Sequence, residues 1–538
     1  MGTKQYDSAT DLLTFSRASG GTALSKISYG NELVPNGTFD TDLSGWEDYN
    51  DTPLWDNGRL YITAPTAFDG ARTTLDSIPT TTGKRYKLTW DVELGTLSSV
   101  KVSVYGVSSA AGLQGESTVS ATGSYTLYFT AGYSSANIYL LSGNAVGSAW
   151  FDNVSVKEVL FDQADGTLQL YNYPNNIPRI EYDATGAVKG LLIEEARTNL
   201  VTYSNDFTNS SWTKCRVSIA SNVSGVTAPD GSETVDKMIP NSTSLEHRVW
   251  DGVSSTAVGE TYSVYAKSAG YDYVWLGYYE GSAYGYAVVN LTNGVVTASN
   301  TANYSVEAST NGFYRISVTK TASGTNPRYI SISPSPTASP TLSSSNVPRY
   351  TGDGTSGIYV YGAQLEAGSF PTSYIPTTGA AATRAVDLAQ IPTSAFGYNN
   401  DRGSLVIDVL TPVADQIMPL AYFNTSSYNN SRSLWKSNSG ITAVGTDYVR
   451  SAYDGATTKF AFGQQTQAEY TKLGLSYGDS EKAVRDGGTV LSGTSRYPNP
   501  TRLHLGGRDN GFQSQCWIKS IQYYPRRLTD TQLQELTT

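Results

Sequence analysis

Side chains that commonly carry catalysis are sparse in this chain. Its 538 residues include two histidines, His247 and His504, and two cysteines, Cys215 and Cys516. A serine or cysteine nucleophile needs a neighbouring base, so few catalytic triads can be assembled. There is also no Walker A loop, no H-E-x-x-H motif and no cysteine pair with zinc-binding spacing. These observations argue against acyl transfer, nucleotide hydrolysis and zinc-dependent chemistry.

Carboxylates leave glycoside hydrolysis as the enzymatic alternative, because it needs only a pair about 5–9 Å apart. The adjacent Glu194 and Glu195 are a poor pair, since neighbours in a strand point to opposite faces. No long β-helix repeat of the kind found in many polysaccharide depolymerases is present. We therefore expect no catalysis and keep a depolymerase as an alternative. Its other candidate carboxylates are Asp401, Asp408 and Asp486.

Aromatic rings close to carboxylates suit the binding of sugars, which present apolar C–H faces flanked by hydroxyls. Residues 271–286 read Y-D-Y-V-W-L-G-Y-Y-E-G-S-A-Y-G-Y. In a strand, Tyr271, Tyr273 and Trp275 share one face and Asp272 lies on the other. This strip is the best candidate platform for a glycan; the alternative is that Tyr273 and Trp275 pack between two sheets. Three earlier rings carry the same two alternatives: Trp55, Tyr61 and Trp90.

Composition indicates the elements that must position these residues. Only 16% of the chain is charged, while aromatic residues make up 12% and there are 51 glycines and 39 tyrosines. Short β-branched and Tyr-rich runs between Gly, Asn, Asp and Ser are typical of strands and turns. We predict an all-β protein of tandem antiparallel β-sandwiches, or jelly rolls, with little helix. The length indicates three or four domains.

Charge and chain signals narrow the function classes further. A net charge of −10 argues against nucleic-acid binding, which needs clustered Lys and Arg. The opening M-G-T-K-Q-Y has no apolar run, so we expect no signal peptide, and no run approaches the ~20 apolar residues of a membrane helix. We expect two separate thiols rather than a disulfide. An adhesin-like composition without a secretion signal fits a virion protein made in the host cytoplasm and released by lysis.

A degenerate internal repeat sets the domain plan. Each copy opens with Leu-Val, a polar turn, Phe, a polar loop and Trp, and then shows three landmark strands in the same order. In both copies the first strand follows a Gly turn and alternates strictly, as half-buried strands do. The landmarks of the two copies are 31–46 with 198–212, 83–93 with 259–267, 123–130 with 312–319, and 150–158 with 358–366.

These landmarks resemble the carbohydrate-binding modules of families four and nine. The first copy matches from Leu33 to Val156, and the second is more diverged, with Tyr361-Gly362 in place of the closing Asp pair. The resemblance implies a jelly roll that holds a structural Ca²⁺, and it assigns a ligand role to Asp152. The alternative for Asp152 is a turn-capping carboxylate, because one carboxylate specifies a calcium site poorly.

Three other segments resemble virion proteins of tailed bacteriophages, of the head-spike-fibre or tail-fibre type. The longest is R-I-E-Y-D-A-T-G-A-V-K-G-L-L-I-E-E-A-R-T-N-L-V-T-Y-S-N-D-F, residues 179–207. D-L-L-T-F-S-R-A-S-G-G-T-A-L (11–24) precedes it and S-Y-I-P-T-T-G-A-A-A-T-R-A-V-D (373–387) follows the second copy. The Leu33–Val156 module then lies as an insertion between the first two segments.

The C-terminal region contains alternating strands and ends with P-R-R-L-T-D-T-Q-L-Q-E-L. Thr529 is the expected N-cap of a short helix, with Leu533 and Leu536 on one face. The order resembles the concanavalin-A-like or laminin-G-like fold. The resulting plan is a virion-attachment segment (1–30), a first module (31–160), a connector (161–197), a second module (198–387) and a lectin-like sandwich (388–538).

The function expected from this plan is a non-catalytic phage fibre that binds host-surface polysaccharide or lipopolysaccharide. A tail fibre is favoured, and a head fibre with accessory adhesion is the alternative. Its expected partners are other virion proteins of the tail or capsid. Phage fibres by resemblance form homotrimers, and no coiled-coil heptad is present, so trimer contacts are expected between sandwich faces. No nucleic-acid partner and no membrane insertion are expected.

Overall fold

The computed structural model describes residues 13–538 except for 107–111, 254–258, 280–283, 302, 321–327, 413–417, 425–430, 437–446, 454–455, 463–469, 497, 509–511 and 514. The chain is 55% strand and 3% helix, which confirms the all-β prediction. In the described part the one α-helix is α1 (Asp530–Thr537), and Thr529 and Gln532 form its capping box. No helix of the described residues is long and apolar enough to cross a membrane.

The chain divides into two compact units. Unit 2 comprises Lys26–Thr167, and unit 1 comprises the residues on both sides of it, up to Ser25 and from Leu168 to Thr538. Unit 2 therefore interrupts unit 1 in the sequence, and it contains the module expected over Leu33–Val156. Residues 1–12 of the expected attachment segment lie outside the described residues.

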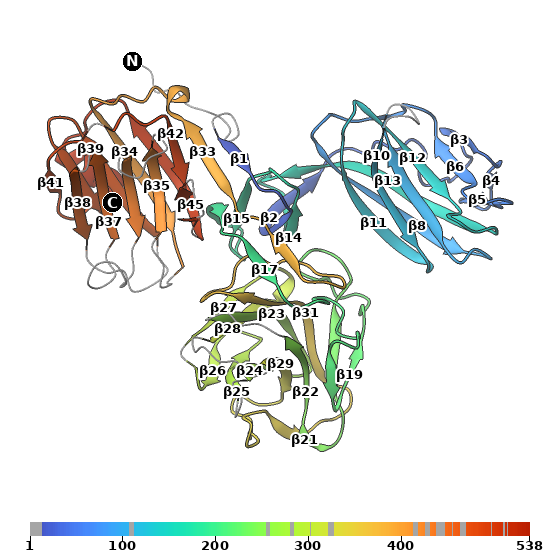
Figure 1. Ribbon diagram of the computed structural model, residues 1–538. Helices are drawn as coiled ribbons and strands as arrows, with labels where there is room; N and C mark the ends of the chain where they lie inside the picture. Colours follow the sequence, from blue (N-terminus) through green and yellow to red (C-terminus); the bar gives the residue numbers. More distant parts are fainter. Residues whose placement is uncertain are drawn as a thin grey trace. The chain divides into compact units, whose positions relative to one another are not determined.

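Unit 2 is a sandwich of two antiparallel sheets around one hydrophobic core (Figure 1). The first sheet contains, in order, β10 (Leu113–Val119), β9 (Val100–Tyr105), β12 (Ser135–Leu141), β6 (Gly70–Thr73) and β3 (Trp46–Tyr49), with β7 (Ile78–Pro79) on β12. The second contains β11 (Gly123–Thr130), β8 (Arg85–Leu94), β13 (Ala149–Phe161), β5 (Leu60–Ile62) and β4 (Leu54–Trp55). The end of β2 (Gly21–Tyr29) also pairs with β13.

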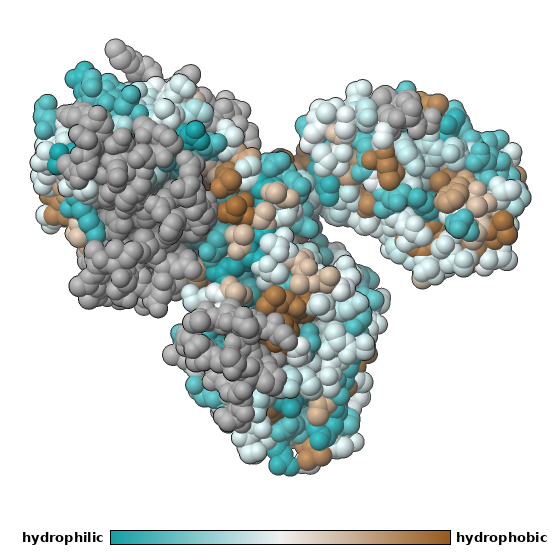
Figure 2. Space-filling view, viewed as in Figure 1, coloured by the Kyte–Doolittle hydropathy of each residue, from teal (hydrophilic) through white to brown (hydrophobic). Residues whose placement is uncertain are grey.

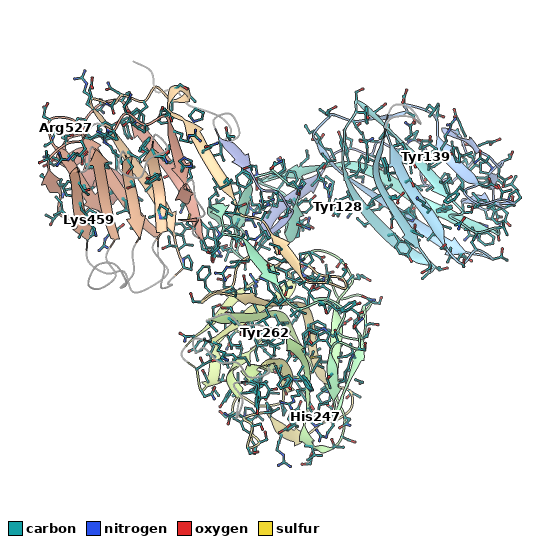
Figure 3. The ribbon with its side chains drawn as sticks, viewed as in Figure 1. Tyr128, Tyr139, His247, Tyr262, Lys459 and Arg527 are labelled. Atoms are coloured by element: carbon teal, nitrogen blue, oxygen red, sulfur yellow. The ribbon has the colours of Figure 1, made fainter. Side chains whose placement is uncertain are left out.

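The second repeat copy forms another sandwich, in unit 1. One sheet contains β18 (Thr213–Cys215), β22 (Arg248–Val253), β29 (Arg328–Ser335), β24 (Tyr273–Tyr279), β25 (Tyr284–Asn290) and β26 (Val296–Ser299). The other contains β19 (Val217–Ala220), β20 (Asp236–Pro240), β31 (Gly357–Ala367), β23 (Glu260–Ala269), β28 (Tyr314–Lys320) and β27 (Tyr304–Ala308). Tyr262 belongs to the core between these sheets (Figure 3). This part also contains the pairings of β21 (Ser244–Glu246) with β30 (Arg349–Thr351) and of β17 (Arg197–Asn199) with β32 (Ala382–Arg384), and the 3-10 turn η2 (Thr310–Gly312).

A third sandwich is built mainly from the C-terminal residues. One sheet contains β15 (Arg179–Tyr182), β16 (Val188–Ile193), β45 (Cys516–Tyr524), β34 (Gly403–Leu410), β39 (Tyr470–Tyr477), β40 (Glu481–Arg485) and β41 (Leu491–Gly493). The other contains β1 (Thr14–Ser16), β33 (Leu388–Pro392), β42 (Arg502–Leu505), β35 (Met418–Asn424), β36 (Ser431–Lys436), β37 (Asp447–Tyr453) and β38 (Ala456–Phe462). Figure 1 shows blue β1 beside orange β33. The remaining elements are β14 (Thr167–Tyr173), η3 (Thr393–Ala395), β43 (Gly507–Arg508) and β44 (Phe512–Gln513). The expected connector and the described part of the N-terminal segment thus contribute strands to this sandwich.

The two repeat copies share sheet order and register. Strands β11-β8-β13 of the first copy correspond to β28-β23-β31 of the second. The closing strand carries a β-bulge in both copies. The bulge contains a residue with positive φ, Asn153 at 50° and Gly362 at 63°. Asn and Gly are the residues that adopt this conformation at least cost, so the bulge explains why the closing motif has them there.

The opening segment of each copy is held to its closing strand in the same way. The Glu32 carboxylate accepts a hydrogen bond from the backbone amide of Val156 at 2.9 Å. In the second copy, the side-chain oxygen of Asn199 accepts a hydrogen bond from the backbone amide of Leu365 at 3.1 Å. A polar side chain before Leu-Val therefore joins the first and last landmarks of each sandwich.

Phe and Trp of the opening motif also play the same part in both copies. Phe39 packs on Trp46 with ring centroids 5.3 Å apart, and Phe207 packs on Trp212 at 4.9 Å. All four rings are buried. Each indole N–H donates to a backbone carbonyl of its own opening loop, which fixes that loop on the core.

Gly37, in the Asn-Gly turn of the first copy, lies against the closing strand. A Cβ at this position would be 1.8 Å from the carbonyl oxygen of Val154. We expect Gly37→Ala to destabilise unit 2 by about 1–3 kcal/mol, because backbone must move to admit the methyl group. Gly132→Ala is the matched control, since a Cβ there has no atom within 4 Å. Thermal unfolding of both variants checks this, and equal midpoints would contradict it.

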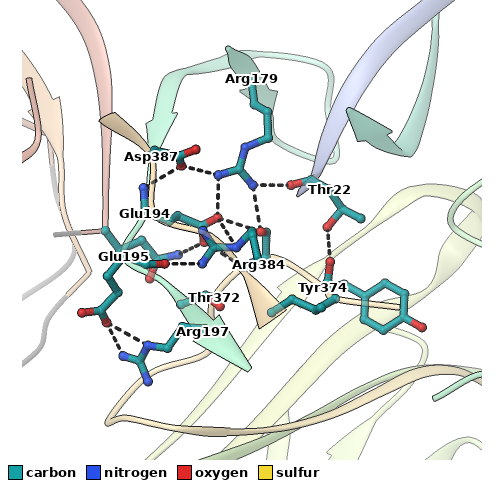
Figure 4. Close-up of polar contacts among 12 residues, drawn as sticks. Thr22, Arg179, Glu194, Glu195, Arg197, Thr372, Tyr374, Arg384 and Asp387 are labelled. Carbon is teal, nitrogen blue, oxygen red and sulfur yellow. Dashed lines mark hydrogen bonds and ion pairs between the residues drawn. The ribbon is translucent and has the colours of Figure 1, made fainter. Parts of the chain in front are cut away.

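A buried charge cluster joins three distant parts of unit 1 (Figure 4). Asp387 pairs with Arg17 at 3.1 Å and with Arg179 at 2.5 Å, while Glu194 pairs with Arg179 at 2.9 Å and Arg384 at 3.4 Å. These side chains are at most 1% exposed. They come from the segments 11–24, 179–207 and 373–387, so these three segments meet in one buried cluster.

Candidate functional site

The outer face of the β11-β8-β13-β5-β4 sheet in unit 2 combines aromatic and carboxylate side chains. Phe151 of β13 is 0% exposed in the core, so by alternation its neighbours Trp150 and Asp152 lie on the outer face. Trp150 is in register with Tyr61 of β5 on one side and Glu93 of β8 on the other. We call this surface the open face.

Two half-buried rings form the apolar part of the open face. The centroids of Tyr61 and Trp150 are 4.8 Å apart. The Trp150 indole N–H donates to the Asp56 carboxylate at 2.6 Å, and the Arg59 guanidinium lies 5.2 Å from the Trp150 centroid. Arg59 in turn pairs with Glu93 at 2.6 Å. These contacts hold the Trp150 ring in one orientation, as a binding platform requires.

Carboxylates and an amide form the polar part, next to the rings. Asp152 is in register with Asp91 of β8. The exposed Asn153 amide donates to Asp91 at 2.7 Å, and its backbone N–H donates to Asp152 at 2.7 Å. Burial raises the pKa of Asp152, and the neighbouring carboxylates of Asp91 and Asp40 raise it further. Such groups can exchange hydrogen bonds with sugar hydroxyls.

The carboxylates around Asp152 can be compared with what a calcium site needs. Ca²⁺ takes 6–8 oxygen ligands, usually from several carboxylates. No group of three or more Asp, Glu, His or Cys side chains that could hold a metal ion is found among the residues that the structure describes. The described side chains thus give no support for a Ca²⁺ ion at Asp152, and the ion expected from the resemblance stays a prediction.

The other candidate rings of unit 2 have different positions. Trp55 lies on edge strand β4, is 47% exposed and donates its indole N–H to the Phe39 carbonyl at 2.7 Å. Trp90 is 1% exposed and stacks on Tyr125 inside the sandwich, so its ring has no access to a ligand. The structure therefore brings Tyr61 and Trp55 to the surface and places Trp90 in the core. Apolar residues on the visible side of this unit occur in small, separate groups (Figure 2).

The aromatic strip of the second copy is covered. Val274 and Leu276 face the core between the sheets, and Trp275, which is 0% exposed, lies on the opposite side of β24. There it packs with Tyr284 and Val347 in a small separate cluster. This differs from both alternatives derived from the sequence, because the ring is neither exposed nor between the sheets.

The neighbours of Trp275 in the strip are also partly covered. Tyr273 is half-buried against the same cluster. Tyr271 is half-buried and lies 5.8 Å from the Tyr350 ring. Val347 lies in the turn just before β30 and Tyr350 lies on β30, so this turn and strand cover the strip from outside the sheet. The predicted strip thus does not form a platform in this structure.

The second copy also lacks an equivalent of the open face. At the positions corresponding to Asp152 and Asp91 it has Tyr361 and Tyr265, which are 3% and 4% exposed. They pack with Leu170 and other residues in a closed cluster. Burial raises the pKa of Tyr265 to about 12, as expected for a phenol out of contact with water. Of the two related faces, the one in the first copy is accessible.

Trp150 was missed by the sequence analysis, although a signal was available. It stands in the closing motif as W-F-D, in which one core Phe separates two outward residues. Alternation around Phe151 places Trp150 and Asp152 together on the outer face.

The two histidines and Glu194, which were considered for catalysis, are buried within the fold. The two ring nitrogens of His247 lie 3.0 Å from the carbonyls of Arg216 and Thr243. Figure 3 shows His247 near β21. His504 is buried on β42. Burial raises the pKa of Glu194, but Arg384 and Arg179 outweigh burial and lower it to about 2.

Of the remaining carboxylates, Asp486 accepts a hydrogen bond from the Lys472 amide at 2.8 Å in a turn. Asp408 lies on β34, and Asp401 lies in the turn before that strand. Asp401 precedes Gly403, the first residue of β34, whereas Asp408 lies near the other end of that strand, in register with Lys472. Asp401 and Asp408 therefore lie near opposite ends of β34. Glu195 forms an ion pair with Arg197.

Comparisons with known proteins identify no relative by sequence. No family model matches the chain, and no curated protein matches it. Among solved structures, the CBM40 module of a Ruminococcus gnavus sialidase is 17% identical, with a TM-score of 0.22, covering 26% of this chain and 83% of that one. The tandem CBM22 modules of Paenibacillus barcinonensis Xyn10C are 14% identical, with a TM-score of 0.20, covering 63% and 98%.

Domain 4 of the Geobacillus stearothermophilus arabinanase AbnA, solved in complex with arabinotriose, is 15% identical with a TM-score of 0.22. It covers 32% of this chain and 83% of that one. These neighbours include carbohydrate-binding modules, but likenesses this low carry no argument about the function of this chain. The site's own geometry must carry that argument.

Proposed function

We propose that this protein is a non-catalytic fibre or spike of a tailed bacteriophage that binds host-surface glycans through the open face of unit 2. One observation carries the glycan-binding part. In the second copy of the duplicated sandwich, this sheet face is covered by other residues. In the first copy the corresponding face presents two rings, Tyr61 and Trp150. Beside them lie the polar side chains of Asp91, Asp152 and Asn153. Rings beside hydrogen-bonding groups match the apolar faces and hydroxyls of sugars.

The virion part of the proposal rests on the three phage-like segments. Their charged residues meet in one buried cluster, which supports treating 11–24, 179–207 and 373–387 as a single scaffold. Unit 2 interrupts this scaffold as an inserted module. The proposed partners are host polysaccharide or lipopolysaccharide and other virion proteins, in a homotrimer whose multiple sites strengthen weak single-site binding.

The binding test uses the full chain on an array of bacterial lipopolysaccharides and capsular polysaccharides. We expect retention on at least one glycan, weakened tenfold or more by Trp150→Ala, because truncating a central Trp typically costs about 2 kcal/mol or more. Phe68→Ala is the control, since Phe68 is an exposed ring of unit 2 outside the open face. Equal affinities for the two variants would contradict a role for the open face.

Two further measurements separate the alternatives. Release of reducing ends from a bound polysaccharide would replace the proposal with a depolymerase. Immunogold localisation on the intact particle is expected to label the tail. Label on the capsid would instead identify a head fibre with accessory adhesion.

A further inference from the structure

A cavity of about 610 Å³ in unit 1 is separate from the open face and borders the buried charge cluster at Glu194. Its walls come from β15 and β16, from β27 and β28, from the loop 369–373, and from the ends of β34 and β45. The volume lies in the range of small-molecule sites, about 300–1,000 Å³. The side chains of its lining indicate the class of ligand that it would accept.

Charged side chains in the lining occur as opposite pairs. The Lys189 ammonium is 3.9 Å from the Glu181 carboxylate and 4.0 Å from the centroid of the Trp517 ring. The Trp517 indole N–H donates to the same carboxylate. On the facing wall, Glu307 of β27 is in register with Arg315 of β28. The opposite charges within each pair cancel, so the lining favours neither a cationic nor an anionic ligand.

The negative charge of Glu194, the remaining charged residue of the lining, is balanced by two arginines of the buried charge cluster. It pairs with Arg179 at 2.9 Å and with Arg384 at 3.4 Å. Its charge is therefore committed to the buried cluster and is not available to balance a ligand.

Two polar groups in the lining have unused hydrogen-bonding capacity. Gln515 is 5% exposed, and its side-chain carbonyl oxygen has no hydrogen-bond partner among the residues that the structure describes. The Nε of Arg315 is buried and likewise has no partner in the described part of the chain, although another nitrogen of the guanidinium donates to Ser263 at 3.2 Å. Buried polar groups in proteins are nearly always paired, so an unpaired acceptor and donor on one cavity point to a ligand that both donates and accepts.

Hydroxyls and rings complete the lining. Ser305 and Ser317 exchange a hydrogen bond at 2.7 Å on the β27–β28 wall, and Phe370 and Trp517 supply apolar surface. We propose that this cavity binds one neutral, polyhydroxylated ligand, a sugar unit without net charge. This site is separate from the open face and does not depend on glycan binding there.

The test is saturation-transfer NMR on the full chain with glucose, galactose and N-acetylglucosamine as neutral probes, and glucuronate and glucosamine as charged ones. We expect at least one neutral sugar to give a saturable signal that exceeds those of the charged sugars. Ser305→Phe, which fills the cavity from one wall, and Gln515→Leu, which removes the acceptor from the other, should each reduce the signal at least tenfold. Phe68→Ala, which changes an exposed ring outside both sites, should leave it unchanged.

Hydrogen–deuterium exchange of the wild-type chain gives a check that needs no variant. A saturating neutral sugar should slow exchange in β27 and β28. Absence of protection there, absence of any neutral-sugar signal, or a signal that survives both cavity variants would overturn the proposal. A signal lost only in Trp150→Ala would overturn it while leaving the proposed function intact.

Discussion

Replacing Asp387 with asparagine is expected to destabilise unit 1 by about 3–5 kcal/mol. The Asp387 carboxylate is fully buried and pairs with both Arg17 and Arg179. It also accepts a hydrogen bond from the Glu194 backbone amide at 2.9 Å. An amide at this position would keep the shape of the side chain but leave the two guanidiniums with less opposing charge, away from water that could solvate them.

Urea denaturation followed by fluorescence measures this effect as a shift in the midpoint of the unit 1 transition. Glu246→Gln is the matched control, because Glu246 and Arg248 form a loose pair at 4.0 Å whose side chains remain partly exposed. Such a change is expected to stay within about 0.5 kcal/mol. If Asp387→Asn moved the midpoint no further than this control, the buried cluster would not stabilise the unit.

The same variant has a local consequence. Arg17 follows β1, which pairs with β33 at the edge of its sheet. Without the Asp387 charge, we expect limited proteolysis to cut near β1 at denaturant concentrations that leave the wild-type chain intact. This result would show that the charge cluster holds the first phage-like segment in place.

The second large effect is expected for Trp275→Ala, at about 3–5 kcal/mol of lost stability. Trp275 is 0% exposed and packs in a cluster with Tyr284, Val288 and Val347. Removing the indole leaves a cavity that the rigid sheet on one side cannot fill. A surface platform residue would change stability far less, so this measurement distinguishes the two roles.

Leu245→Ala provides the comparison in the same sandwich, because Leu245 is 38% exposed. We expect it to alter the unfolding midpoint by no more than about 0.5 kcal/mol. Glycan binding by Trp275→Ala at a temperature where it stays folded should equal that of the wild-type chain. A stable Trp275→Ala variant with impaired glycan binding would restore the strip as a platform.

Local sequence patterns determined the strands and the orientation of their side chains. Alternation correctly separated Val274 and Leu276 from Trp275, because successive residues of a strand point to opposite faces. The repeated landmarks likewise indicated two related copies, and the structure shows that these share the neighbouring strands β11-β8-β13 and β28-β23-β31. Thr529 was predicted as N-cap of the one described α-helix for the same reason, since capping depends on nearby residues.

The identity of the accessible face depended on tertiary structure. Trp275 is covered by a loop that contains Val347, and Tyr361 by residues that include Leu170, all distant in the sequence. No periodicity within a strand reports what packs over it from elsewhere in the chain. The cavity beside Gln515 and the cluster around Asp387 likewise arise only when separate segments meet. The sequence by itself thus determined the all-β class, the repeat and the direction of each side chain, because these depend on neighbours along the chain. Which rings remain open to a ligand was decided by long-range packing.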